Sequence, residues 1–415
     1  MLFWDDGSRR GEVYDLWQRN FQDPVPYADF YFDQYYGRNR VLLHADDETG
    51  KINGSIHLNP YSVNVRGKAF AASYIVGVAT DEEYRRQGIM REMLHETFSR
   101  LREEGAPFTY LMPADEAYYL PFGFRFGMSQ TEQEIMCLPA REDLRFQFRD
   151  HLSREEARKA VQVEQEEKEQ LFAVFTEVDE DYLSRLEKEA ASDYGRMIYV
   201  FEEQPAGEDS DRKDETYIGR FCVAAEYDTL LINRIFCRRD CRKDFLKDIL
   251  RHQEDTYHYG NYQVVLDMSW DDLIMPAGPQ GHVRFLVPHR KKKIMFRILD
   301  LEKIGDLLRI DLSKDEEGRL YVRDPAFSSL EGYYEIYPQP DGRVLINKAD
   351  NTAVRTGNSP EDWGTVEIGT LTSLLFGDLT LEEMEKEDVA CLTEAGRDFL
   401  ASLIPLSPTC IMEIV

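Results

Sequence analysis

The sequence predicts a mixed α/β protein with more than one domain. Short runs rich in β-forming residues, such as 74–80 and 108–112, alternate with helical patterns. From Gly88 onward, apolar residues recur at a spacing of three and four, which marks one buried helix face. The chain has 415 residues, and at roughly 150 residues per domain this length favours two or three domains.

Composition and charge limit the classes of protein that fit. Hydrophobic residues make up 42% of the chain and charged residues 31%, which is typical of a folded protein with ordinary cores. No apolar run in the sequence reaches the roughly 18 residues of a membrane span. The formal net charge of -28 repels phosphate groups, so we expect neither nucleic acid nor an anionic membrane as a partner. A cationic substrate suits this charge better.

The first region alternates helices and strands. An aromatic-rich stretch over 14–36 precedes two extended segments. The run 74–80 suits a central strand that is buried on both faces. The helix predicted from Gly88 ends at Gly105-Ala106-Pro107, where the next strand begins.

The second and third regions repeat parts of this pattern. Residues 154–170 form a charged stretch that predicts a solvent-exposed helix. Extended segments, a helix and a strand at 262–268 then follow in an order that loosely repeats the first region. In the third region, Pro340-Asp341-Gly342 marks a hairpin turn, and Thr380 to Glu383 forms a capping box.

Two groups of side chains are expected to be structural. The six cysteines include no C-x-x-C pair, which suits free thiols in a reducing cytosol. Cys237 and Cys241 could form half of a metal site, but no histidine lies close in sequence, and structural roles are favoured. The basic run 289–293 is either an anion patch or a solvated strand end, and the acidic composition favours the strand end. The first residues lack the features of a signal peptide, so we expect a cytoplasmic protein.

The most informative segment covers 76–91 and predicts an anion site. A buried strand leads into an Arg-x-x-Gly loop, from Arg85 to Gly88, and a helix starts at the glycine. A helix N-terminus presents unpaired backbone N–H groups and the positive end of the helix dipole. Gly88 lets a ligand approach the backbone, while Arg85, Arg86 and Arg91 add charge for a pyrophosphate. The alternative is a surface turn that only caps the helix; the flanking strand and helix favour the anion site.

This segment resembles the acetyl-coenzyme A motif of the GNAT N-acetyltransferases, in which a strand, an Arg-x-x-Gly-x-Gly/Ala loop and a helix hold the pyrophosphate. Met90 replaces the usual last Gly/Ala. Essentially the whole chain is similar to one branch, the Eis (enhanced intracellular survival) acetyltransferases. Besides the loop, the resemblance rests on Tyr119-Leu120-Pro121-Phe122-Gly123-Phe124, on Met295-Phe296-Arg297-Ile298-Leu299-Asp300, and on the closing helix and tail.

The resemblance implies three domains and one co-substrate. These are a GNAT domain over 1–142, a second, degenerate GNAT-like domain over 143–293 and a sterol carrier protein-like α+β domain over 294–415. Acetyl-coenzyme A is the expected co-substrate and no metal is expected. Backbone N–H groups around Val76 to Val78 would hold the thioester carbonyl, an oxyanion-type role. The implied cofactor-binding residues are Val76, Val78, Arg85, Arg86, Gln87, Gly88, Ile89, Met90 and Arg91.

By the same resemblance the general acid is Tyr119, in the Tyr-x-x-Phe-Gly-Phe motif. A phenol with a pKa near 10 is protonated at neutral pH and can donate to a departing thiolate. Tyr118 is the adjacent competitor, because the chain has 23 tyrosines and most of them must serve packing.

The general base implied by the resemblance is the α-carboxylate of Val415, reaching from the third domain into the GNAT cleft. The family commonly ends in an aromatic residue, so Ile414 and Val415 depart from its pattern. Glu413 is an alternative carboxylate, either as base or as an anionic contact for a polyamine.

One active site per chain is expected. After the strand predicted at 230–236, the second region reads Cys-Arg-Arg-Asp-Cys-Arg-Lys without a glycine, which obstructs a pyrophosphate. The leading hypothesis is direct acetyl transfer to amines of a cationic substrate, either aminoglycoside-like or a lysine side chain. The competing hypothesis is a non-catalytic scaffold that binds coenzyme or lipid. The resemblance also implies a homo-oligomer, namely a hexamer.

Overall fold

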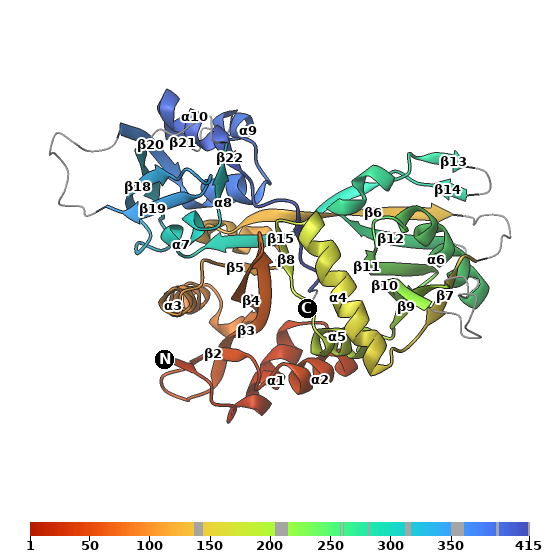
Figure 1. Cartoon of the computed structure of the whole chain (residues 1–415). Helices are drawn as coiled ribbons and strands as arrows, with labels where there is room; N and C mark the ends of the chain where they lie inside the picture. Colours follow the sequence, from red (N-terminus) through yellow and green to blue (C-terminus); the bar gives the residue numbers. More distant parts are fainter. Residues whose placement is uncertain are drawn as a thin grey trace.

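The computed structural model shows three regions arranged around a long mixed sheet (Figure 1). The structure describes residues 1–136, 144–203, 215–257, 259, 261–280, 283–311, 317–349, 361–386 and 390–413.

One sheet runs through the first two regions. Among the described residues it has sixteen strands, with the main path β1-β2-β3-β4-β5-β15-β6-β12-β11-β10-β9-β7. On this path β4–β5 and β11–β12 are parallel pairs. The strands of the path are β1 (Leu2–Trp4), β2 (Arg40–Ala45), β3 (Ile52–Val65), β4 (Lys68–Thr80), β5 (Phe108–Leu111), β15 (His289–Ile298), β6 (Arg125–Met136), β12 (Asn261–Asp267), β11 (Thr229–Cys237), β10 (Glu215–Glu226), β9 (Arg196–Glu203) and β7 (Phe146–Arg149). Off this path lie β8 (Val174–Thr176), β23 (Thr409–Cys410), β13 (Gly278–Gln280) and β14 (Val283–Phe285).

Three helices pack on the first region. α1 (Arg10–Asn20) and α2 (Val25–Gln34) fill the aromatic-rich stretch, and α1 packs on β3 and β4. α3 (Ile89–Glu103) follows Gly88 and buries the predicted apolar stripe against β2, β3 and β4. It ends near the predicted stop, because Gly105 adopts a φ of +87° that most residues avoid.

The second region buries charged side chains that the sequence pattern placed in solvent. α4 (Arg154–Leu171) starts with a capping box at Ser153 and packs on β10. Its Glu164 and Lys168 are buried, and Glu164 accepts hydrogen bonds from the buried guanidinium of Arg220. The expectation of a solvent-exposed helix is therefore wrong for this face. Charge content alone does not reveal a neutralising partner on a distant strand.

Two more helices complete the second region. α5 (Glu180–Ser192) packs against α2 and β9, so it joins the first region to the second. α6 (Arg242–Tyr257) belongs to a separate hydrophobic core, to which it contributes Phe245 and Ile249.

The third region has its own sheet, with strand order β19-β18-β17-β20-β21. The hairpin turn predicted at 340–342 joins β18 to β19, and the capping box of Thr380 and Glu383 forms as expected. The strands are β17 (Gly318–Arg323), β18 (Gly332–Pro338), β19 (Val344–Lys348), β20 (Glu361–Glu367) and β21 (Ala390–Leu392), with β16 (Arg309–Ile310) and β22 (Leu403–Ile404) paired apart. The helices are α7 (Leu301–Gly305), α8 (Ile368–Phe376), α9 (Leu381–Lys386) and α10 (Glu394–Ser402).

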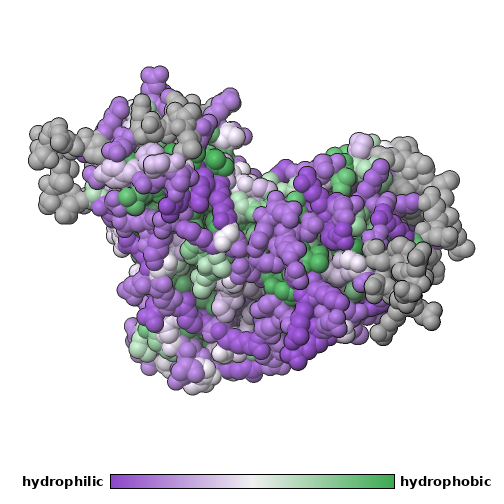
Figure 2. Space-filling view, in the orientation of Figure 1, coloured by the Kyte–Doolittle hydropathy of each residue, from purple (hydrophilic) through white to green (hydrophobic). Residues whose placement is uncertain are grey.

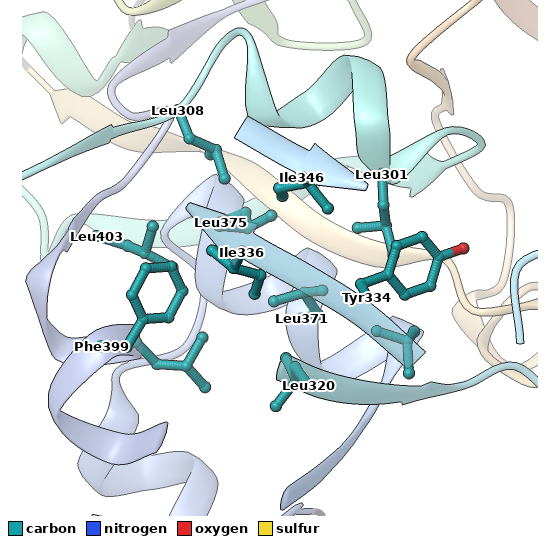
Figure 3. A pocket seen from close by; sticks show the side chains of 12 residues that line it. Leu301, Leu308, Leu320, Tyr334, Ile336, Ile346, Leu371, Leu375, Phe399 and Leu403 are labelled. Carbon is teal, nitrogen blue, oxygen red and sulfur yellow. The ribbon is translucent and has the colours of Figure 1, made fainter. Parts of the chain in front are cut away.

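A small apolar cavity lies inside the third region. Side chains of α8, α10 and the sheet line it, with Leu371, Leu375 and Ile336 among them (Figure 3). Its volume is about 20 Å³. A cavity of this size holds about one water molecule.

β15 joins the regions, because it lies between β5 and β6 in the large sheet. The boundary predicted at 293/294 falls within this strand, while the one at 142/143 lies outside the described residues. The basic run at its start is confirmed as a solvated strand end. Lys291 and Lys293 pair with Glu132, and Lys292 pairs with Asp378.

The predicted mixed α/β fold class is confirmed. None of the helices in the described ranges combines the length and the hydropathy needed to cross a membrane. The face of the molecule shown in Figure 2 is mainly hydrophilic, with small separated hydrophobic patches.

Candidate active site

The central feature of the site is the divergence of β4 from β5. These parallel strands pair at a single position, Tyr74 with Tyr110. Beyond Tyr74, the edge of β4 that faced β5 has no strand partner among the described residues. Backbone groups of Val76 to Val78 on that edge are therefore available to a ligand.

Gly77 shapes this part of β4. Its φ is +59°, and the pairing with β3 shifts register between Ser55 and His57. A Cβ at Gly77 would lie 2.6 Å from Trp17 and 3.0 Å from His57. Only glycine fits between these rings with this backbone conformation, so the bulge depends on the aromatic packing of α1.

The Arg-x-x-Gly loop has the open geometry that the sequence predicts. Gly88 has a φ of +89°, and a Cβ added there would meet nothing within 4 Å. The first backbone N–H groups of α3, those of Ile89, Met90 and Arg91, have no intrahelical acceptor, and none of the described side chains caps this N-terminus. The side chain of Ile89 is buried, which leaves its backbone as the group available to a ligand.

The loop arginines differ in their surroundings. Arg85 donates hydrogen bonds to the Thr80 carbonyl (3.1 Å) and to Asn20 (3.0 Å), so it braces the loop against β4 and α1. Arg86 and Arg91 are exposed. The Arg91 guanidinium lies 5.6 Å from the centre of the Phe122 ring, within the range of a cation–π contact. This contact brings the loop next to the predicted acid segment.

Tyr119 and Tyr118 lie in contrasting environments. Tyr119 is 9% exposed and its ring meets Phe124 edge to face at 5.7 Å, whereas Tyr118 is 60% exposed. Burial raises the pKa of the Tyr119 phenol to about 12. Tyr119 therefore keeps its proton at neutral pH, and it is the more buried of the two tyrosines.

The tail of the chain enters the same area. Thr409 and Cys410 pair in parallel with β8, which is antiparallel to β3, as β3 is to β4. The tail therefore runs parallel to β4, toward the end where β4 leaves β5, and Figure 1 shows it leaving the third region for the seam between the other two. Ile414 and Val415 lie outside the described residues.

Glu413 is the last described residue and is buried at 3% exposure. Its Oε2 accepts a hydrogen bond of 2.9 Å from Thr176, and its Oε1 has no hydrogen-bond partner among the described residues. Burial raises the pKa of the carboxyl, and Tyr110 and Tyr182 are close enough to interact with it electrostatically. A carboxyl group thus lies near the level at which β4 and β5 diverge.

An acidic pocket of about 560 Å³ opens beside this area. Glu132 and Glu189 in its wall are paired with cations, whereas among the described residues Asp23 accepts one hydrogen bond, from the indole N–H of Trp17. Burial raises the pKa values of Asp23 and Asp193, which interact with each other electrostatically. The charged lining residues are Asp23, Glu132, Glu189, Asp193, Glu226, Arg234, Lys291 and Lys293. Sequence reasoning missed them, because they lie on separate elements and only the net charge hinted at such a pocket.

The comparisons bear on the first region most directly. Residues 8–127 match the family model described as an acetyltransferase (GNAT) domain. The chain carries a GNAT acetyltransferase domain. This confirms the prediction of an acyltransferase of the GNAT class. No curated protein sequence matches the chain.

Solved structures extend the likeness of the fold beyond the GNAT domain. A conserved protein from Enterococcus faecalis, described as a probable N-acyltransferase, aligns with a TM-score of 0.78 at 15% identity and covers 98% of this chain and 97% of that chain. A GCN5-related N-acetyltransferase from Anabaena variabilis gives 0.75 at 13% identity, covering 99% of both chains. Eis1 from Mycobacterium abscessus gives 0.67 at 13% identity, with 98% and 97% covered. The predicted likeness to the Eis fold is confirmed at this level.

The structure places the other predicted site residues as follows. The acetyltransferase domain brings Val76, Val78 and the 85–91 loop to one side of the β4–β5 divergence. The Phe122 contact adds Tyr119 to this set. Within the described residues, no group of three or more His, Cys, Asp or Glu side chains could hold a metal.

His57, which packs against Gly77, should make the stability of the fold depend on pH. Burial lowers its pKa to about 3, from an unfolded value near 6.5. The unfolded chain therefore binds the extra proton between these values, and folding stability falls as the pH drops through this window. Between pH 6.5 and 4.5 we expect the wild type to lose about 2 kcal/mol more unfolding free energy than His57→Leu, measured by urea unfolding. Equal losses in both proteins would contradict a neutral, buried His57.

Proposed function

We propose that this protein transfers the acetyl group of acetyl-coenzyme A directly to an amine of a cationic substrate. The observation that carries the proposal is the free edge of β4 beyond Tyr74, which leads straight to the open N-terminus of α3. The free edge of β4 suits a thioester carbonyl, and the N-terminus of α3 suits a pyrophosphate.

The chain's own groups fit the coenzyme at both ends of the path. Gly88 leaves open space beside unpaired N–H groups, and Arg86 and Arg91 add exposed positive charge. Backbone N–H groups at Val76 to Val78 would polarise the thioester carbonyl. Acetyl-coenzyme A supplies the acetyl group in activated form.

Tyr119 is the proposed general acid. As the substrate nitrogen bonds to the carbonyl carbon and the C–S bond breaks, the Tyr119 hydroxyl gives its proton to the departing sulfur. Its buried position and its contact with Phe124, next to the Arg91–Phe122 contact, support this role.

A carboxylate of the tail is the proposed base that takes the proton from the attacking amine. The leading candidate is the α-carboxylate of Val415, and Glu413 is the alternative. The direction of the tail, parallel to β4, supports the delivery of either group. The raised pKa of Glu413 makes its carboxyl a better proton acceptor than an ordinary one.

The acidic pocket is the proposed acceptor site. Arg234 interacts electrostatically with Asp193, but Asp23 has no cationic partner among the described residues, so an ammonium group on the substrate would neutralise Asp23. Glu189 of the pocket interacts electrostatically with Tyr35, whose hydroxyl lies 3.0 Å from that of Tyr61. The ring of Tyr61 lies 6.3 Å from that of Tyr74, at the β4–β5 divergence. An aminoglycoside-like polyamine or a lysine side chain fits this chemistry.

The third region is proposed to be a sterol carrier protein-like support rather than a lipid carrier. The cavity enclosed by its described residues, about 20 Å³, offers no room for a lipid in this conformation.

Release of thiol from acetyl-coenzyme A, measured on a panel of amines, tests the proposed enzyme activity against the non-catalytic alternative. Coenzyme binding without thiol release on any amine would favour a scaffold. The implied hexamer stays a prediction for sedimentation analysis.

Gly88→Glu should abolish acetyl-coenzyme A binding, because it places bulk and negative charge where the pyrophosphate meets backbone N–H groups. Gly37→Glu is the matched control, since Gly37 has a φ of +92° and equally open surroundings. Isothermal titration with acetyl-coenzyme A should show wild-type affinity in Gly37→Glu and no binding in Gly88→Glu. Unchanged affinity in Gly88→Glu would show that the coenzyme binds elsewhere.

Tyr119→Phe should lower kcat by about 100-fold or more, the low end for lost general acid catalysis, with little change in coenzyme affinity. Tyr118→Phe should be mild, because its exposed ring faces solvent. Steady-state kinetics with both variants distinguishes the two tyrosines. A large loss of kcat in Tyr118→Phe and a mild one in Tyr119→Phe would identify Tyr118 as the acid.

Residues added after Val415 should lower turnover by about 100-fold, because they carry the α-carboxylate out of reach. An N-terminal tag of the same length is the control and should leave turnover unchanged. Glu413→Gln distinguishes the two carboxylates. Full turnover in the extended protein together with a large loss in Glu413→Gln would transfer the role of base to Glu413.

A further inference from the structure

Arg125 is hydrogen-bonded to the segment that follows Tyr119. Its Nη1 donates to the carbonyl of Leu120 (2.9 Å) and to that of Phe124 (2.7 Å). Leu120 follows Tyr119 in the chain, and its carbonyl also accepts the N–H of Gly123 (3.1 Å). One guanidinium thus ties together both ends of the 120–124 turn.

The third region fixes Arg125 from the other side. A Cβ at Gly369 of α8 would lie 2.7 Å from Arg125 Cζ and 2.9 Å from both terminal nitrogens. The guanidinium therefore sits flat against the helix backbone, where a glycine alone leaves room. Ile368, the preceding residue, lies 3.1 Å from a Cβ at Gly123, so α8 touches the turn itself.

A second arginine completes this support. Arg297 of β15 is buried, pairs with the buried Asp324, and its Nε lies 3.1 Å from a Cβ built at Gly123. A buried ion pair is rigid, because breaking it leaves an uncompensated charge in the core. The turn after Tyr119 thus rests on α8 and on two arginines.

We propose that Arg125 is a positioning residue for the acetyl transfer, and that α8 acts on the reaction through it. Arg125 holds the backbone after Tyr119, so that the phenol stays directed at the departing sulfur. This inference rests on the proposed role of Tyr119 as the acid. It gives the third region a task in the chemistry that differs from delivery of the tail.

The physical consequence of losing Arg125 is a freer turn. Two backbone carbonyls lose a charge-assisted hydrogen bond, and Tyr119 samples positions outside the productive one. A displacement of about 1 Å can cost up to 10²-fold in rate. Coenzyme binding should be spared, because it depends on β4 and on the 85–91 loop.

A double-mutant cycle separates positioning from mere structural support. Arg125→Ala should lower kcat about tenfold or more in the wild type, but less than twofold in the Tyr119→Phe background. The dissociation constant of acetyl-coenzyme A should stay within twofold throughout. Arg125→Lys, which keeps the charge but presents fewer donors, should recover part of the loss.

Gly369→Ala is the second probe and does not remove the arginine. Its methyl group should displace the guanidinium and lower kcat, again only when Tyr119 is present. Gly11→Ala is the matched control, because Gly11 is also the second residue of a helix and a Cβ there meets nothing within 4 Å. We expect no effect of Gly11→Ala.

The outcomes distinguish the inference from the function on which it rests. Equal losses from Arg125→Ala or Gly369→Ala with and without Tyr119 would overturn the positioning role and leave the acid intact. If Tyr119→Phe alone leaves kcat unchanged, the proposed acid fails and the positioning role fails with it.

Discussion

The site depends on one constraint in the sheet, the restriction of β4–β5 pairing to Tyr74 and Tyr110. A longer parallel ladder would satisfy the backbone of β4 and leave nothing for a ligand. Gly77 maintains the departure, because its positive φ and its contacts with Trp17 and His57 exclude any side chain. The aromatic packing of α1 and α2 is thus part of the site, although none of those rings lies in the predicted motif.

Parts distant in sequence surround this opening. The 85–91 loop and α3 come from the GNAT domain, the tail arrives from the end of the chain, and α8 supports the turn after Tyr119. β15 links the third region to this opening, because it lies between β5 and β6 in the large sheet. A fragment limited to residues 8–127 would contain the 85–91 loop but lack β15, α8 and the tail.

Local patterns in the sequence predicted several of the elements that surround this candidate site. The apolar stripe after Gly88 located α3, and the Arg-x-x-Gly loop located its open N-terminus, because both signals reside in adjacent residues. The preference for Tyr119 over Tyr118 came from resemblance, and burial supports it. Features that need partners from elsewhere were not predictable. The sequence predicted a solvent-exposed Glu164, because its partner Arg220 lies on a strand far away in the sequence. Asp23 and Asp193 are likewise distant in sequence and interact electrostatically in the folded chain.

Hydrogen exchange at backbone amides, measured with and without acetyl-coenzyme A, tests the central claim most directly. The account predicts that the coenzyme slows exchange at Val76 to Val78 and at Gly88 to Arg91, since these N–H groups gain acceptors. Amides of β11 and of the start of α6, the corresponding part of the second region, should be unaffected. Protection at β11 and α6, with unchanged exchange along the free edge of β4, would contradict the account.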